Sequence, residues 1–112
     1  MADATRIEKR HIDTLLDGAA DVATRAASAT ALEACSDPAA ARALLQVAQD
    51  PDAPAKLSIA AGTALGTICF RRAQDLDDLA SAQMNEEAYV AYDREIARLQ
   101  RERPDVRIRR HA

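Results

Sequence analysis

Two segments of the chain repeat one pattern at an offset of 33 residues, and this repeat constrains the fold more than any other feature. Residues 24–35 align with residues 57–68: both have small residues at the fourth and fifth positions, then Thr-Ala-Leu, then an apolar residue at the end. Such a period is typical of stacked supersecondary units, none of which can bury its apolar face alone. We therefore expect similar units packed side by side.

The composition indicates that these units are helical. Alanine accounts for 27 of the 112 residues, against ten leucines. Alanine has the highest helix propensity and lets helix backbones approach closely. With three glycines, four prolines and few β-branched runs, a sheet is not expected. The sequence predicts an all-α protein of one domain with a thin core.

Apolar spacings of three and four residues, bounded by glycine, proline and capping residues, predict five helices and one short helical turn. The expected ranges are 3–17, 22–35, 38–49, 54–72, 76–82 and 86–103. Asp37 is expected to cap the third helix and Asn85 the last. The buried stripes should include Ile7 and Leu16 on the first helix, Ala31 on the second, and Tyr89, Tyr92, Ile96 and Leu99 on the last.

Gly62 and Gly66 lie four residues apart within the expected fourth helix. Each glycine costs a helix about 1 kcal/mol relative to alanine. We therefore expect the two glycines to share one helix face and to be compensated by close packing against a neighbouring helix.

Residues 42–69 carry a recognisable repeat pattern in Leu44-Leu45, Asp50-Pro51-Asp52 and Ala60-Ala61, followed by Ala64-Leu65-Gly66-Thr67-Ile68. This pattern resembles the HEAT-type repeat, whose second helix follows V-R-x-A-A-x-x-A-L-G-x-I. Residues 12–35 match more weakly, although Arg25 falls on the arginine of the pattern, and residues 75–103 carry no motif. The resemblance implies a short right-handed stack of antiparallel helix pairs, HEAT- or armadillo-like, with five to six helices. Residues 1–103 would form this domain, and residues 104–112 a basic, flexible tail.

No set of residues suitable for catalysis is present in the sequence. The two histidines, His11 and His111, are far apart, and His11 is expected on a helix surface. Cys35 and Cys69 do not form a Cys/His metal pattern and are expected to be small buried hydrophobes. No phosphate-binding glycine loop or nucleophile elbow is found. The sequence predicts a protein without enzyme activity, metal or cofactor.

The chain also lacks the features of a secreted or membrane protein. No apolar run reaches the ~20 residues of a membrane span, and residues 1–20 are charged throughout. Two cysteines do not suggest a disulfide framework. We expect a cytoplasmic protein with no membrane partner. The 13 arginines against two lysines, together with the alanine content, are typical of GC-rich bacterial genomes.

Charge is distributed unevenly along the chain. Residues 1–100 hold ten basic and sixteen acidic residues, a net charge of −6, whereas residues 101–112 have a net charge of +3. The acidic body makes nucleic acid an unexpected partner and favours a basic protein. The candidate partner-binding residues are Asp50, Asp52, Asp75, Asp77, Asp78, Glu86, Glu87, Tyr89 and Asp93. The alternative is that the acids are only solvated or capping residues and that the tyrosines lie in the core.

In size, charge and lack of a catalytic set the chain is similar to small bacterial immunity proteins. The leading hypothesis is therefore a non-enzymatic module that binds and neutralises a cognate, basic toxin such as a nuclease. Two alternatives remain open. One is nucleic-acid binding through Arg107, Arg109 and Arg110, and the other is a weak homo-oligomer or scaffold whose exposed terminal repeat faces pair.

Overall fold

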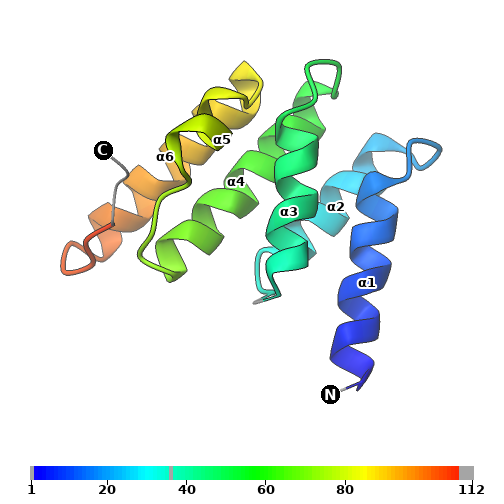
Figure 1. Cartoon of the computed structure of the whole chain (residues 1–112), viewed down its shortest axis with the longest axis horizontal. Coiled ribbons are helices and arrows are strands. Elements are labelled where there is room, and N and C mark those ends of the chain that lie inside the picture. The colour runs from blue at the N-terminus through cyan, green and yellow to red at the C-terminus, as the bar shows by residue number, and fades with distance from the viewer. Residues whose placement is uncertain (1, 36, 109–112) are drawn as a thin grey trace.

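The computed structural model describes residues 2–35 and 37–108 of the chain. They form six helices: α1 (Ala2–Leu16), α2 (Val22–Leu32), α3 (Pro38–Ala48), α4 (Ala55–Arg71), α5 (Asp78–Ala82) and α6 (Glu86–Glu102) (Figure 1). The described ranges contain no β-strand. The predicted all-α class with five to six helices is confirmed.

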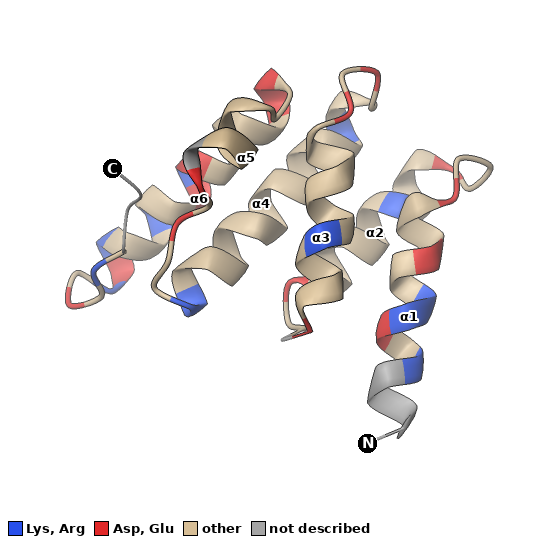
Figure 2. Ribbon diagram, viewed as in Figure 1, with Lys and Arg blue, Asp and Glu red and all other residues tan. Residues whose placement is uncertain are grey.

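Polar side chains at the loop ends define where four of the helices begin. Asp21, Asp37, Asp77 and Asn85 each accept a hydrogen bond from a backbone N–H in the first turn of the helix that follows. The caps predicted at Asp37 and Asn85 are confirmed. Figure 2 shows that many of the acidic residues lie at helix starts and in loops. At these positions a carboxylate satisfies backbone donors that have no partner within the helix.

The C-terminal end of α2 is held by hydrogen bonds from another helix. α2 ends at Leu32, three residues before the predicted end. The Arg71 guanidinium, at the end of α4, donates hydrogen bonds to the carbonyl oxygens of Glu33 and Cys35, both at 2.7 Å. These bonds satisfy carbonyl groups that continued helix would have used.

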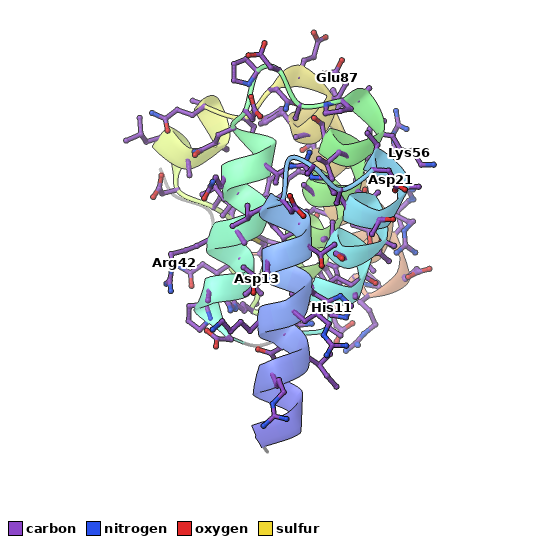
Figure 3. The ribbon with its side chains drawn as sticks, turned by 90° about the vertical axis from the view of Figure 1, so that its right-hand side faces the viewer. His11, Asp13, Asp21, Arg42, Lys56 and Glu87 are labelled. Atoms are coloured by element: carbon purple, nitrogen blue, oxygen red, sulfur yellow. The ribbon has the colours of Figure 1, made fainter. Side chains whose placement is uncertain are left out.

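The helices are arranged in two layers. Figure 3 shows α3 and α5 on one side of the molecule and α2, α4 and α6 on the other. In the second layer α4 lies between α2 and α6 and contacts both, and it also contacts α3. α1 contacts α2 and α3. Consecutive helices therefore pack as pairs, α1 with α2 and α3 with α4, and α4 is the central helix.

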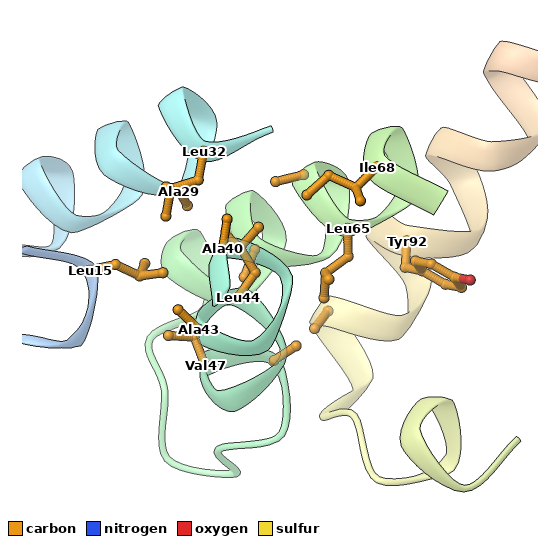
Figure 4. Packing of buried hydrophobic residues seen from close by; sticks show 14 of the residues in the cluster. Leu15, Ala29, Leu32, Ala40, Ala43, Leu44, Val47, Leu65, Ile68 and Tyr92 are labelled. Atoms are coloured by element: carbon orange, nitrogen blue, oxygen red, sulfur yellow. The ribbon is translucent and has the colours of Figure 1, made fainter. Parts of the chain in front are cut away.

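The core lies between the two layers and combines leucine and isoleucine with many alanines (Figure 4). Its largest fully buried apolar side chains are Leu15, Leu32, Leu44, Leu57, Leu65, Ile68 and Ile96. Four residues predicted to be buried are exposed. Ile7 is 55% exposed, Tyr89 47% and Leu16 37%, and Ala31 also lies at the surface.

α4 and α6 approach most closely at the two glycines. A Cβ atom added to Gly62 would lie 2.9 Å from the carbonyl carbon and 3.0 Å from the Cα of Ala88 on α6. A Cβ on Gly66 would lie 3.0 Å from the carbonyl oxygen of Tyr92 and from the Cβ of Glu95. The predicted close approach at Gly62 and Gly66 is confirmed, and it brings the α6 backbone directly against α4.

The described part of the expected tail is in contact with the body. Ile108 is half-buried and packs against the hydrophobic core. Arg103 and Asp105, at the end of α6, form an exposed ion pair at 3.4 Å. Arg109 and Arg110, on which the nucleic-acid alternative rests, lie outside the described residues.

Candidate functional site

The structure brings four of the predicted acidic residues to one end of the molecule. Asp50 and Asp52 lie in the α3–α4 loop, and Glu86 and Glu87 in the first turn of α6. All four are exposed. We call this group the acidic end (Figure 2). In the described part of the chain none of the ion pairs involves these four carboxylates, so their charge is available to a partner.

Asn85 holds the two halves of the acidic end together. Its backbone N–H donates to the carbonyl oxygen of Ala48 at 2.7 Å. Its side-chain Nδ2 donates to the carbonyl oxygen of Asp50 and to the hydroxyl of Ser58, both at 2.9 Å. Ser58 is fully buried, so the Asn85 amide provides a partner for a hydroxyl that has no access to water. The same residue thus caps α6 and attaches its first turn to the α3–α4 loop.

The remaining predicted acids do not join the acidic end. Asp77 caps α5 by accepting from the backbone N–H of Ala80 at 2.8 Å. Asp75 is half-buried and accepts hydrogen bonds from the Tyr92 hydroxyl and from the backbone N–H of Leu76. Asp93 is exposed on α6, and the side chain of Asp78 lies outside the described part of the chain. Asp75 and Asp77 therefore have structural partners in the connection between α4 and α5.

The cysteines and the buried tyrosine are in environments that favour their neutral forms. Burial raises the pKa of the Cys69 and Cys35 thiols. Burial, together with the hydrogen bond to Asp75, also raises the pKa of the Tyr92 hydroxyl well above its ordinary value. A thiol rather than a thiolate is a poor nucleophile and a poor metal ligand. Cys69 is buried as predicted, whereas Cys35 is only half-buried.

A groove lies between α4 and α6, next to the acidic end. Its volume is about 360 Å³, and it is lined by Ile59 of α4 and by Glu86, Glu87, Val90, Ala91 and Arg94 of α6. Ile59 is 48% exposed and Val90 is 45% exposed. We call this feature the α4–α6 groove. It places two solvent-accessible aliphatic side chains beside two carboxylates.

The sequence prediction missed Ile59, Val90 and Arg94. One signal was present in the repeat, because Ile59 occupies the position of Ala26 in the first unit. Ala26 is buried, whereas the larger Ile59 is half-exposed. Val90 and Arg94 could not be assigned without knowing which face of α6 packs on α4.

The two ends of the α4–α6 groove differ in charge. Glu86 and Glu87 lie at one end, and Arg94 lies two turns further along α6. Glu95, the residue after Arg94, pairs with Arg98 at 2.9 Å and accepts a hydrogen bond from the Thr67 hydroxyl at 2.8 Å. The hydrogen bond from Arg98 lowers the pKa of Glu95, so its charge is already compensated within the protein. Only the Glu86–Glu87 end presents uncompensated negative charge.

No protein family, curated protein or solved structure matches this chain. Among the residues described by the structure, no group of three or more histidine, cysteine, aspartate or glutamate side chains is placed to hold a metal ion. Within the same ranges, none of the helices combines the length and the apolar character required to cross a membrane. The site is therefore interpreted from its own geometry.

Proposed function

We propose that this protein is a non-enzymatic binding module that recognises a basic partner protein through the acidic end and the α4–α6 groove. The observation that carries the proposal is the placement of Ile59 and Val90, each nearly half exposed, beside the exposed Glu86 and Glu87. Burial of such aliphatic side chains supplies affinity. Carboxylates at the rim increase the rate of encounter and select a partner of opposite charge.

The dimensions of the groove favour a protein side chain over a small molecule. At about 360 Å³ it is at the lower end of the range for small-molecule sites, which bury most of the ligand surface. This groove is open along one side. The carboxylates of Asp50 and Asp52 extend the recognition surface beyond it, over the α3–α4 loop. An apolar side chain of a partner, flanked by lysine or arginine, fits this arrangement.

The specific form of the proposal is an immunity protein that binds a cognate bacterial toxin in the cytoplasm and blocks it sterically. The acidic end supports this form, because a nuclease or other nucleic-acid-directed toxin carries a basic surface. The two-layer stack of helix pairs, with α2 and α4 at equivalent positions of the 33-residue repeat, supports the proposed likeness to HEAT-type scaffolds. Fold alone does not decide function, so the proposal depends on the surface.

The test uses the product of the neighbouring gene as the candidate partner. We expect the two purified proteins to form a complex that weakens as salt is raised. Glu87→Lys should weaken the complex by about tenfold or more, because it puts repulsion in place of an attraction at the rim. Asp93→Lys makes the same charge change on the exposed surface of the same helix, outside the groove lining, and should change the affinity by less than about threefold.

Co-expression provides the functional measurement. Cells that make the partner alone should be inhibited, and co-expression of the wild-type chain should restore growth, with Glu87→Lys protecting less than Asp93→Lys. Absence of a complex together with absence of protection would refute the immunity form. A complex that both substitutions weaken equally would show that the α4–α6 groove is not the binding surface.

A further inference from the structure

Helix α1 presents a surface that is complementary in charge to the α4–α6 groove and carries an exposed apolar side chain. Ile7 is a large apolar side chain that is 55% exposed. The neighbouring Arg6, Lys9 and Arg10 are exposed, as is Asp13. We propose that α1 of a second copy of this chain occupies the α4–α6 groove, with Ile7 against Ile59 and Val90.

The order and spacing of charges specify the alignment. On α1, Arg6 precedes Asp13 by seven residues, and on α6, Glu87 precedes Arg94 by seven residues. Seven residues are two helical turns, so each pair lies on one face of its helix and spans about 10.5 Å. The signs are opposite, positive to negative on α1 and negative to positive on α6. A parallel alignment therefore places Arg6 beside Glu87 and Asp13 beside Arg94.

The other charges around the groove are compatible with this alignment. Lys56, one turn before Ile59, lies near Asp21 on the α2 side (Figure 3). Arg10 lies one turn after Arg6 on α1, so it faces the Ala91 position of α6, between Glu87 and Arg94 and within one turn of Glu87.

The contact must form between copies. α1 and α6 lie at opposite ends of the molecule (Figure 1), and α1 contacts α2 and α3. A contact between two different surfaces is heterologous, so each copy retains one free α1 and one free groove. The assembly therefore grows with concentration beyond a dimer, into an open chain or a closed ring.

This inference does not depend on the proposed function, but the two share a surface. Glu86 and Glu87 belong both to the acidic end and to the α4–α6 groove. A partner protein and a second copy therefore compete for the groove, and the partner is expected to dissociate the self-assembled form.

The first measurement is sedimentation velocity of the full chain at low ionic strength, over increasing concentration. One helix in one groove makes a small contact, so we expect a dissociation constant of about 0.1 to 1 mM. The average mass should rise above the monomer mass of 12.1 kDa and fall back when salt is added. Ile7→Glu and Val90→Glu should each abolish the rise. Leu79→Glu is the matched control, because Leu79 is 69% exposed on α5, and it should leave the rise unchanged.

Mixing two charge-reversed chains gives the decisive result. The chain with Arg6→Glu and Arg10→Glu, and the chain with Glu86→Lys and Glu87→Lys, should each remain monomeric. Their mixture should associate again, because the intact α1 of one chain meets the intact groove of the other and the two reversed surfaces meet each other. This recovery also shows that both variants are folded. A wild-type chain that is monomeric at about 1 mM, a mixture that fails to associate, or equal behaviour of Val90→Glu and Leu79→Glu would overturn the inference. Partner binding that persists in those cases would leave the proposed function intact.

Discussion

Replacing Gly62 by alanine is the substitution for which local propensity and packing make opposite predictions. Within an isolated helix the change should stabilise α4 by about 1 kcal/mol. In the folded protein the new methyl group would meet backbone atoms of Ala88, with 2.9 Å to the carbonyl carbon and a closer approach to the carbonyl oxygen. Backbone cannot rotate away as a side chain can. We therefore expect packing to decide the sign, and Gly62→Ala to destabilise the protein.

The magnitude follows from how far α6 would have to move. Ordinary contact begins at 3.4 Å, so the carbonyl carbon alone requires a shift of about 0.5 Å and the oxygen requires more. The start of α6 cannot shift freely, because Asn85 hydrogen-bonds to Ala48, Asp50 and Ser58. An added methyl group in a well-packed core costs about 1–3 kcal/mol. Because the contact is with backbone atoms, we expect a cost in the upper part of this range, about 2–3 kcal/mol. The gain in helix propensity of about 1 kcal/mol offsets part of it, which leaves a net loss of about 1–2 kcal/mol.

Urea denaturation followed by circular dichroism measures this difference, and two further glycines calibrate it. Gly66→Ala should be less destabilising, because its closest contacts are 3.0 Å and one of them is the Glu95 side chain. Gly18→Ala should be neutral or slightly stabilising, because no atom lies within 4 Å of the added Cβ. A Gly62→Ala protein at least as stable as the wild type would refute the close α4–α6 contact.

Three further predictions concern single positions. Ala73, just after the C-terminal cap of α4, has φ 54, a left-handed conformation that favours glycine. Ala73→Gly should therefore raise the free energy of unfolding, measured in urea, by about 0.5–1 kcal/mol. A lower free energy of unfolding would contradict this prediction. Asn85→Asp keeps the α6 cap but removes the hydrogen-bond donor to Ser58, so it should lower the free energy of unfolding by about 1–2 kcal/mol in the same assay. Asn85→Ala also removes the cap and should lower it further. Equal stability of Asn85→Asp and wild type would contradict this. Arg98 lowers the pKa of Glu95 from 4.5, so this carboxylate stabilises the fold above its unfolded-state pKa. The stability advantage of wild type over Glu95→Gln should be complete at neutral pH and shrink as pH falls below about 4.5, and a pH-independent difference would refute it.

The predictions that rested on local chemistry were the ones that the structure confirmed. Asp37 and Asn85 cap their helices because an acceptor side chain there satisfies backbone donors wherever the helix packs. Gly62 and Gly66 indicated a close helix contact because their cost within a helix needs compensation. Neither inference required knowledge of which helix is the neighbour.

The predicted burial of Tyr89 failed because it depended on how α6 is rotated about its axis. Helical spacing is satisfied by the predicted stripe of Tyr89, Tyr92, Ile96 and Leu99. It is satisfied equally well by the face that the structure buries, which begins at Ala88. The glycines of α4 accept the small Ala88 at the contact, and this rotation turns Tyr89 toward solvent and places Val90 at the groove. The choice is made between helices, so it is not encoded in the spacing of one helix.

The acidic site was predicted only in part, again because contacts between helices decide which residues come together. Asp50 and Glu86 are distant in the sequence, and contacts made in the fold, among them the hydrogen bonds of Asn85, bring their segments together. Asp75 and Asp77 are closer to Glu86 in sequence, yet their carboxylates are used within the α4–α5 connection. Proximity in sequence was therefore a poor guide to the composition of the acidic end.

We propose that this chain acts through the surface formed by the acidic end and the α4–α6 groove. An amide chemical-shift map of the isotope-labelled protein, recorded during titration with the product of the neighbouring gene, tests this directly. We expect the largest changes on Ile59, Glu86, Glu87, Val90 and Ala91, with smaller changes at Asp50 and Asp52. Changes confined to α1 and α3, with those residues unaffected, would contradict it.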